Sequence, residues 1–355
     1  MESENFSVTT KRRDIARSHL ERLGMRGPFR FIRLPGGTNN QVFLVEGNGS
    51  KVVLKMYFKR ESDPRDRLGV EYSFLQFAVD LGVDSVPQPL GFDSQSAFGI
   101  YEYIEGRHIA TEDIRPELME QALRFVKKLE AGKKTAQAQQ LGFASEACFS
   151  FLDYQRANEN RLCALSEIDD STESHKNALK FVRCQLIPFW NEMLGYVTDK
   201  AKSSGLSWEE SVSFENRSLS PSDFGFHNAL LTKEGRVVFL DFEYAGWDDP
   251  IKMVSDFFSQ HQVETPLDYF PKFVSAMVSR MRYPELQYKR AFLVLPLVQV
   301  KWCCILLNHF LPVGQERRFF ANSSQSGERH KHQQLAKAKK ALQKLESEIL
   351  HSSQP

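Results

Sequence analysis

Three oxygen-bearing side chains flank two short apolar runs near the middle of the sequence. Asp223 and Asn228 precede the first run, and Asp241 directly follows the second. The runs are joined by Lys-Glu-Gly-Arg, and a Glu-Gly pair between β-prone segments predicts a hairpin. Because a hairpin brings its outer ends together, the three side chains should converge. Two carboxylates and a carboxamide at one point suit a hard cation such as Mg²⁺ and one general base.

An Asp-x4-Asn pair taken alone is also ordinary turn chemistry, in which both side chains cap loops. Here the order is more specific: a loop aspartate, an asparagine five positions on, a strand, a turn, a second strand and Asp-Phe. This order is typical of phosphoryl-transfer enzymes of the protein-kinase type. We therefore interpret the stretch as a catalytic and metal-binding element.

A second group of residues, nearer the N-terminus, is suited to binding phosphate. Gly36 and Gly37 lie between two predicted strands, where backbone N–H groups can approach an anion closely, and Thr38 and Asn39 add donors. A lysine and a glutamate follow them. Taken singly, the glycine pair also fits an ordinary β-turn, and the lysine also fits a strand lysine that faces water.

Lys55 lies within an apolar strand, where a buried cation needs a partner. Glu71, sixteen positions later on a predicted helix, can supply that partner. A glycine turn, a strand lysine and a helix glutamate together describe a clamp for nucleotide phosphates.

The elements that must position these residues fall into two halves. Strands are predicted at residues 29–34, 41–46, 52–57, 86–92 and 99–104, with one inserted helix at 67–81 and a short N-terminal helix at 8–23. Helices are predicted at 116–132, 151–168, 173–203 with a kink at Pro188, 266–282, 284–310 and 330–350. The pattern predicts an α+β chain with a small antiparallel β-rich lobe, a connector near Tyr101–Gly106, and a larger α-rich lobe that carries the hairpin.

These halves set the expected domain boundaries. Residues 1–104 form the N-terminal lobe with its short helix, and residues 105–322 form the C-terminal lobe with the acceptor pocket. Residues 323–355 form a polar loop and a C-terminal amphipathic helix.

Composition excludes several classes of function. The chain has 355 residues, a formal net charge of +1 and 41% hydrophobic residues, so no global charge favours nucleic acid or an anionic membrane as a partner. Five cysteines without a CxxC spacing indicate reduced thiols in a cytosol-like compartment. The most apolar stretch, Phe292–Leu307, is interrupted by polar residues and reads as a buried helix. We expect a cytoplasmic monomer or homodimer.

The sequence resembles the aminoglycoside phosphotransferase and choline kinase family, the small-molecule branch of protein-kinase-like enzymes. The resemblance runs from about residue 31 to 258 and is carried by LPGGTNNQVFLVE, VVLKMYFK, SPSDFGFHN and FLDFEYAGWDDP. It implies a bilobed protein-kinase-like fold with ATP and Mg²⁺ as cofactors.

The resemblance also implies a role for each motif residue. Asp223 would accept or orient the proton of the substrate hydroxyl, and Asn228 and Asp241 would hold Mg²⁺. The cofactor-binding residues implied are Gly36, Gly37, Thr38 and Asn39 over the phosphates, Lys55 paired with Glu71 on the α- and β-phosphates, and Glu102 and Tyr103 in the connector that receives adenine.

Two features depart from the usual patterns. The family usually has His-Gly before the catalytic aspartate, and here the pair is Pro221-Ser222, which concerns the geometry of the loop more than the chemistry. After Asp241 the chain reaches Asp248-Asp249-Pro250 at once, so it has no room for the long segment with which protein kinases dock polypeptides. A small acceptor is favoured.

The acceptor itself is not specified. Trp302 and His309 share a helix face that would serve either as a pocket wall or as core. The basic excess after residue 283 disfavours an aminoglycoside and leaves sugars, amino alcohols and anionic metabolites open. We predict transfer of the γ-phosphate of ATP to a hydroxyl of such a molecule. The alternative is a kinase-like pseudoenzyme that binds nucleotide or a partner without catalysis.

Overall fold

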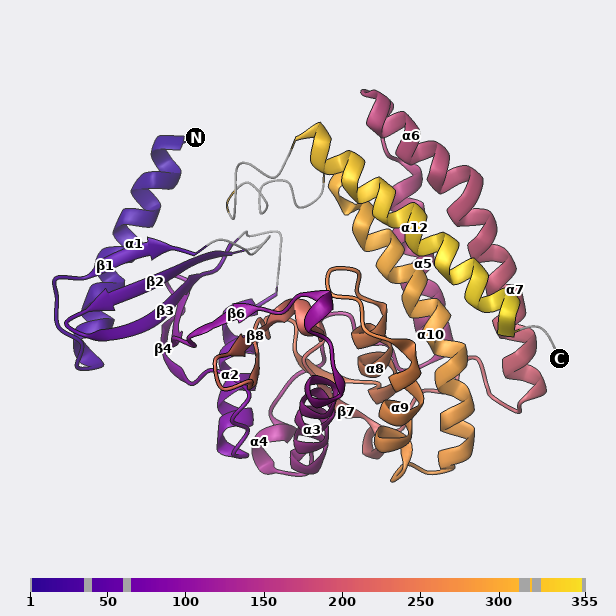
Figure 1. The fold of residues 1–355 in the computed structure, drawn as a ribbon, viewed down its shortest axis with the longest axis horizontal. Coiled ribbons are helices and arrows are strands. Elements are labelled where there is room, and N and C mark those ends of the chain that lie inside the picture. Colours follow the sequence, from indigo (N-terminus) through magenta and orange to yellow (C-terminus); the bar gives the residue numbers. More distant parts are fainter. Residues whose placement is uncertain (1, 35–39, 60–64, 313–319, 321–326, 353–355) are drawn as a thin grey trace.

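The chain folds into two lobes, a smaller one rich in strands and a larger one rich in helices (Figure 1). The computed structural model describes residues 2–34, 40–59, 65–312, 320 and 327–352. The predicted phosphate turn, with Gly36, Gly37, Thr38 and Asn39, lies outside these residues. The α+β, bilobed arrangement predicted from the sequence is confirmed.

The smaller lobe is built on a five-stranded antiparallel sheet in the order β1-β2-β3-β5-β4. Its strands are β1 (Arg30–Arg33), β2 (Gln41–Gly47), β3 (Ser50–Met56), β4 (Pro89–Asp93) and β5 (Phe98–Glu102). All five predicted strands are present. Strand β4 begins at Pro89, later than predicted, because the segment before it supplies the connection from the inserted helix rather than a ladder.

The two faces of the sheet have different neighbours. Helix α1 (Glu2–Arg22), which begins earlier than predicted, covers one face and buries Ala16 and Leu20 against Leu54 of β3. Because side chains alternate along a strand, Lys55 points to the opposite face. That face is covered by α2 (Arg67–Asp80), which carries Glu71.

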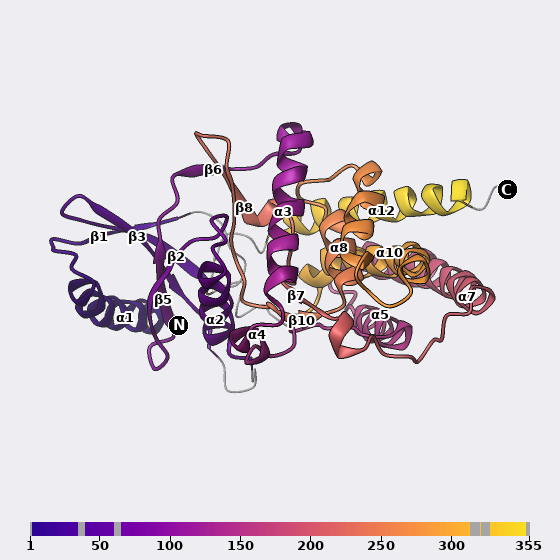
Figure 2. The ribbon, with the colours of Figure 1, turned by 90° about the horizontal axis from the view of Figure 1, so that it is seen from below.

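The larger lobe consists of helices and short strands. Its helices are α3 (Pro116–Gly132), α4 (Ala136–Gln139), α5 (Phe151–Ser166), α6 (Glu173–Phe181), α7 (Ile187–Ser203), α8 (Pro250–Ser259), α9 (Phe270–Val278), α10 (Pro284–Leu307) and α12 (Glu328–Ser352). Its strands are β6 (Gly106–His108), β7 (Ser218–Ser220), β8 (Ala229–Thr232), β9 (Val237–Phe239) and β10 (Gly246–Asp248). Strands β6 and β8 lie between the β-rich lobe and the helices, beside α3 (Figure 2).

The single helix predicted over residues 173–203 is divided in two. A π-helical turn, Val182–Leu186, separates α6 from α7. Proline lacks an N–H and its ring crowds the preceding turn, and Pro188 lies in the first turn of α7, where neither property is costly. The irregularity predicted at the proline is therefore absorbed as a wider turn just before it.

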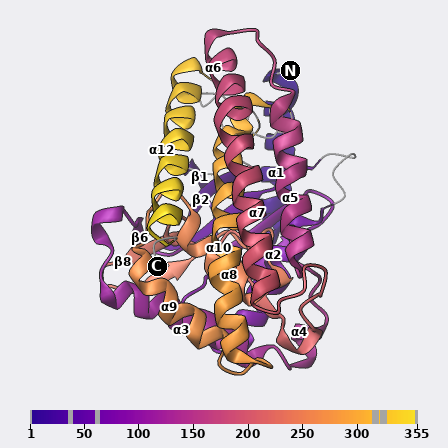
Figure 3. The same cartoon turned by 90° about the vertical axis from the view of Figure 1, so that its right-hand side faces the viewer.

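Helix α10 is the centre of the larger lobe. It contacts α5, α7, α8, α9 and α12, and Figure 3 shows α5, α7, α10 and α12 standing side by side. By length and composition alone the helix at Pro284–Phe310 is long and apolar enough to cross a membrane, but half of its apolar window is buried inside this fold. Packing against these helices supplies a local reason for its apolar character.

One hydrophobic core continues from the helical lobe into the β-rich lobe. Phe242, directly after Asp241, stacks on Phe74 of α2 with ring centroids 5.1 Å apart. Phe239 of β9 stacks on Phe125 of α3 at 4.7 Å. These buried rings hold the end of the hairpin against helices from both lobes.

Candidate active site

The predicted hairpin is present, and it brings the expected residues to one end. Strands β8 and β9 pair antiparallel with Ala229 opposite Phe239. Beyond this pair, the Leu240 N–H donates to the Asn228 carbonyl at 2.8 Å. The last ladder bond therefore lies between Asn228 and the residue that precedes Asp241.

Asp223 is held in place by two side chains that follow it. Asn228 Nδ2 donates to the Asp223 carboxylate at 3.0 Å and to its main-chain carbonyl at 3.0 Å. His227 Nε2 lies 3.1 Å from the other carboxylate oxygen. Burial opposes ionisation of Asp223, but the charge of His227 and the bonds from His227 and Asn228 outweigh it, so the pKa of Asp223 is lowered. The carboxylate is thus kept ionised.

The unusual Pro221-Ser222 pair is accommodated by a left-handed backbone conformation and one local hydrogen bond. Ser222 has a φ of +68°, a left-handed conformation in which glycine is unstrained and other residues are not. Its N–H donates to Ser220 Oγ at 3.0 Å. The loop therefore adopts a conformation suited to glycine without one. His227, which follows Asp223, supplies a brace on the aspartate.

Lys55 joins the two lobes. Its Nζ lies 2.7 Å from Glu71 Oε2 and 2.5 Å from Asp241 Oδ1. Tyr57 donates to the same Glu71 oxygen at 2.5 Å, and Tyr57 and Tyr101 share a hydrogen bond of 2.7 Å. Burial lowers the pKa of Lys55, but Asp241 and Glu71 raise it by more, so Lys55 stays charged. The predicted neighbours Lys55 and Glu71 are brought together, with Asp241 as a third member.

Negative charge is in excess around Lys55. Glu71, Asp241 and Glu243 all act on this one ammonium group. Burial, followed by Glu243 and Glu71, raises the pKa of Asp241 to about 7, although Lys55 opposes the shift. Asp241 also has a φ of +65°, a strained conformation of the kind that gathers at functional sites. This donor set fits a divalent cation, because a cation would offset the surplus carboxylate charge.

The protein's own ligands for such a cation are few. Across the described ranges, no group of three or more His, Cys, Asp or Glu side chains is arranged to hold a metal ion. With Asn228 Nδ2 bound to Asp223, the Oδ1 atom of Asn228 is the atom suited to a metal. A cation here would depend on Asp241, Asn228 and oxygens brought by a ligand, which is the usual pattern for Mg²⁺ with phosphates.

The connector residues lie at the end of β5. The Glu102 N–H donates to the Gln88 carbonyl at 2.9 Å, and Glu102 Oε2 accepts from the Gln88 N–H at 3.1 Å. The Lys51 ammonium lies 5.6 Å from the centre of the Tyr103 ring. Glu102 is thus hydrogen-bonded to the main chain of Gln88, and the adenine-binding role of Glu102 and Tyr103 stays a prediction.

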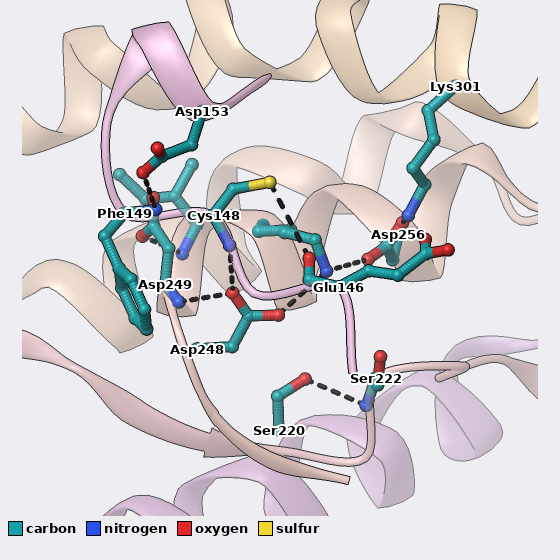
Figure 4. A network of polar contacts seen from close by, with 12 residues as sticks. Glu146, Cys148, Phe149, Asp153, Ser220, Ser222, Asp248, Asp249, Asp256 and Lys301 are labelled. Carbon is teal, nitrogen blue, oxygen red and sulfur yellow. Dashed lines mark hydrogen bonds and ion pairs between the residues drawn. The ribbon is translucent and has the colours of Figure 1, made fainter. Parts of the chain in front are cut away.

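A buried charge network lies beneath Asp223. Lys252 Nζ contacts Asp248 Oδ2 at 2.8 Å and Asp256 Oδ2 at 3.1 Å. Asp256 also accepts from Trp302 Nε1 at 2.8 Å and is paired with Lys301. Figure 4 shows Asp248, Asp256 and Glu146 gathered between the loop that carries Ser222 and the helix that carries Lys301. The network ties α8 and α10 to β10, which pairs with β7, the strand that precedes the Asp223 loop.

A cavity of about 510 Å³ opens beside this network. It lies between one face of α5 and the C-terminal part of α10 and includes Lys301 and Asn308. Trp302 is buried beside His227, with ring centroids 6.0 Å apart, whereas His309 lies against His330 of α12. Trp302 and His309, for which a shared pocket wall and core packing were both open, therefore face different neighbours, and neither lines this cavity.

Several residues of the site were missed in the sequence. His227 and Glu243 follow Asp223 and Asp241 within a few positions, and this short spacing could have identified them in the sequence. Asn40, whose Nδ2 donates to Glu243 Oε2 at 2.6 Å, and Lys301 come from distant elements that only the fold brings to the site. Arg317 and Arg318, which contribute to the basic excess after residue 283, lie outside the described residues.

Comparisons with known proteins agree with this geometry. Residues 30–195 match the model of the phosphotransferase enzyme family, a segment that ends before Asp223. No curated protein matches the sequence. The solved gentamicin complex of APH(2")-IIa is similar in fold, with a TM-score of 0.54 at 15% identity, covering 93% of this chain and 95% of that one.

Two further solved structures share the fold. Choline kinase LicA from Streptococcus pneumoniae has a TM-score of 0.53 at 15% identity, over 94% of this chain and 99% of that one. An ethanolamine kinase from Plasmodium vivax has a TM-score of 0.52 at 11% identity, over 86% and 83%. At these identities the likeness shows the protein-kinase-like fold alone. The family match covers residues 30–195, less than half of the chain, so this segment is similar to the phosphotransferase enzyme family.

Proposed function

We propose that this protein is a small-molecule kinase that transfers the γ-phosphate of ATP to a hydroxyl group of a small acceptor. One observation carries the proposal. Lys55, Glu71 and Asp241, from three separate elements, form one buried ion-pair network, and the hairpin that ends at Asp241 also holds Asp223 and Asn228. A nucleotide-phosphate clamp and a candidate base thus meet where the lobes join.

Each residue has a proposed role in the reaction. Lys55, oriented by Glu71, binds the α- and β-phosphates as a charged donor. Asp223, which is kept ionised, aligns the acceptor hydroxyl and receives its proton. The acceptor oxygen then forms a bond to the γ-phosphorus, the bond from that phosphorus to the β–γ bridging oxygen breaks, and ADP leaves with the electron pair.

Asn228 and Asp241 would hold Mg²⁺, which supplies charge neutralisation on the phosphates when it is bound. The surplus carboxylate charge around Lys55 supports this role. The half-buried connector at the end of β5, with Glu102 and Tyr103, is proposed to receive adenine. The turn at residues 36–39 is proposed to cover the phosphates.

Asp223→Asn tests the proposal. The variant keeps the size and shape of the side chain but has one acceptor oxygen in place of two and cannot accept a proton, so we expect phosphate transfer to fall by about 10²- to 10⁴-fold. Nucleotide affinity, measured by calorimetry with a non-hydrolysable ATP analogue, should stay within about twofold. ADP release is followed over pooled hydroxyl-containing metabolites, with Asp199→Asn on the exposed face of α7 as a matched control.

Two results count against the proposal. Full turnover by Asp223→Asn removes Asp223 from the chemistry. A wild-type protein that binds nucleotide and phosphorylates no pool favours the binding-only alternative.

A further inference from the structure

The cavity beside the buried charge network of Lys252, Asp256 and Lys301 has a definable chemistry. It is lined on one side by a face of α5 and on the other by residues at the end of α10 and beyond it. Its charged and amide-bearing residues are Glu146, Asp153, Arg156, Asn160, Arg161, Lys301 and Asn308. Small side chains, Ala147, Ala157 and Ala164, leave the space open. A volume of about 510 Å³ suits a small metabolite.

Both carboxylates on this wall are already engaged by neighbouring groups, Glu146 by an ion pair and one oxygen of Asp153 by main-chain N–H groups. Glu146 is ion-paired with Arg161, and Arg161, Lys301 and Lys252 lower the pKa of Glu146 against the effect of burial. One oxygen of Asp153 accepts from the Phe149 and Ser150 N–H groups in the cap of α5, at 2.9 and 3.0 Å. These acids therefore offer little unbalanced charge to a cationic acceptor.

The acids beneath the cavity are balanced as well. Asp256 is shared between Lys252 and Lys301, and Asp248 accepts from Lys252. Asp249 accepts from Arg290 at 2.6 Å and from the Tyr154 hydroxyl at 2.8 Å. An amine-bearing acceptor would need a carboxylate freed from such a partner, and breaking a buried ion pair is costly.

Arg156 is the exception among the charged groups of the cavity wall. It is exposed on α5, and among the residues that the structure describes it has no ion pair or hydrogen bond. Asn160 lies one turn further along the same helix face and also lines the cavity. The wall thus presents a guanidinium without a partner beside a carboxamide. This combination suits a ligand that has an anionic group next to a hydroxyl.

We propose that the acceptor is a hydroxylated anion, and that Arg156 binds its carboxylate or phosphate group. This inference rests on the proposed function, because it names the acceptor class of the same site. Lys301 lines the cavity, and the ring centroid of its neighbour Trp302 lies 6.0 Å from that of His227, which contacts Asp223, so the cavity is linked to the candidate base. The anion at Arg156 and the reacting hydroxyl near Asp223 would lie at opposite ends of one molecule.

Matched compounds separate the charge of the acceptor from its shape. Glucose, glucuronate, glucose 6-phosphate and glucosamine form one series, and glycerol, glycerate, glycerol 3-phosphate and 3-amino-1,2-propanediol form a second. Each compound is titrated calorimetrically into full-length protein saturated with a non-hydrolysable ATP analogue, which occupies the nucleotide phosphate sites. ADP release with ATP is measured in parallel.

We expect anionic members of at least one series to bind more tightly than their neutral and amine partners. Arg156→Gln should weaken that binding by about 10- to 100-fold, the loss of one charge-assisted hydrogen bond, and leave nucleotide affinity unchanged. Arg156→Glu should reverse the order toward the amines. Arg124→Gln, at an exposed position on α3, is the matched control and should change neither. The carboxylate and phosphate members show which anion is preferred.

The two proposals fail in different ways. Tighter binding of amine than anionic members, or anion binding that Arg156→Gln leaves unchanged, overturns the anionic acceptor while the kinase proposal stands. No anion binding in either series also overturns it. Arg156-dependent anion binding without any ADP release supports the anion site and overturns phosphate transfer.

Discussion

Lys55 Nζ lies 2.5 Å from Asp241 Oδ1, although 186 residues separate the two along the chain. Lys55 belongs to the central part of the β-rich sheet, and Asp241 ends the hairpin of the helical lobe. Their contact makes the junction of the lobes an electrostatic one. The residues proposed to bind phosphate and metal also hold the lobes in register.

Replacing Lys55 by methionine tests both consequences of this contact. Nucleotide affinity should fall by about 10- to 100-fold, because a charged donor to phosphate is lost. The free energy of unfolding should fall by about 3–5 kcal/mol, because Glu71 and Asp241 lose their buried counter-charge. Calorimetry and urea denaturation measure the two effects.

Lys51→Met on the same strand is the control for Lys55→Met. Lys51 is exposed, so its removal should change the unfolding free energy by no more than about 0.5 kcal/mol. Undiminished nucleotide binding by Lys55→Met would falsify the assignment of Lys55 to the phosphates.

Asp241→Asn separates metal binding from nucleotide binding. In the wild type, Mg²⁺ should tighten binding of a non-hydrolysable ATP analogue relative to the same titration with EDTA. The variant should lose this gain, because an amide is a weaker ligand for Mg²⁺ than a carboxylate. Its unfolding free energy should fall by less than that of Lys55→Met, because Lys55 keeps Glu71 as a partner and the carboxylates Glu71 and Glu243 are relieved of a like charge. An Mg²⁺ effect of wild-type size in the variant contradicts the metal role.

The left-handed conformation of Ser222 predicts opposite effects of two substitutions. Ser222→Gly should keep or raise the unfolding free energy, because glycine adopts a φ of +68° without strain. The variant also keeps the main-chain N–H that donates to Ser220 Oγ. Ser222→Val should lower it by about 1–3 kcal/mol, because a β-branched residue is strained there. Equal stability of the two variants in urea denaturation argues against the conformation.

His261 predicts how stability depends on pH. Burial, outweighing the attraction of Glu264, lowers the pKa of His261 to about 4, and Lys344 and Lys337 add to the shift. Its Nε2 atom is buried without a hydrogen bond to the described residues. In the unfolded chain the pKa is near 6.5, so between pH 6.5 and 4 the unfolded state binds the extra proton.

Stability should therefore be lost as pH falls through this window, with a contribution from His261 of at most about 1.4 kcal/mol per pH unit. His261→Leu should flatten the slope of unfolding free energy against pH, measured by urea denaturation from pH 7 to 4.5. His108→Gln, at an exposed position on β6, is the control and should leave the slope as it is. If His261→Leu leaves the slope unchanged, His261 is not the source of the pH dependence.

Much of the site was predictable because it depends on the order of residues within short stretches of the chain. The hairpin forms from two β-prone runs and a glycine turn, and Gly235 takes a φ of +77° in that turn. A hairpin joins its own ends, so the placement of Asn228 and Asp241 at the same end of it needed no knowledge of the rest of the chain. Lys55 and Glu71 were paired because a lysine in a buried strand requires a counter-charge.

Other features were beyond local reasoning. The contact of Asn40 with Glu243 spans 203 residues, and that of Lys301 with Asp256 spans 45. Helix α1 was expected to begin later than it does, because its first turns carry no apolar periodicity. The bracing of Asp223 by His227 required the conformation of the loop, which Ser220 and Ser222 stabilise through one hydrogen bond.

The sequence by itself determined the chemistry available, because side-chain type and hairpin spacing decide which oxygen ligands and which base can meet. Only the tertiary structure decided the balance of charge. Lys55 faces three carboxylates, those of Glu71, Asp241 and Glu243. The acids under the cavity each have a cationic partner, whereas Arg156 on its wall has no carboxylate partner among the described residues. Pairing of buried charges depends on distances of a few ångströms between distant segments, and such distances are set by packing rather than by order along the chain.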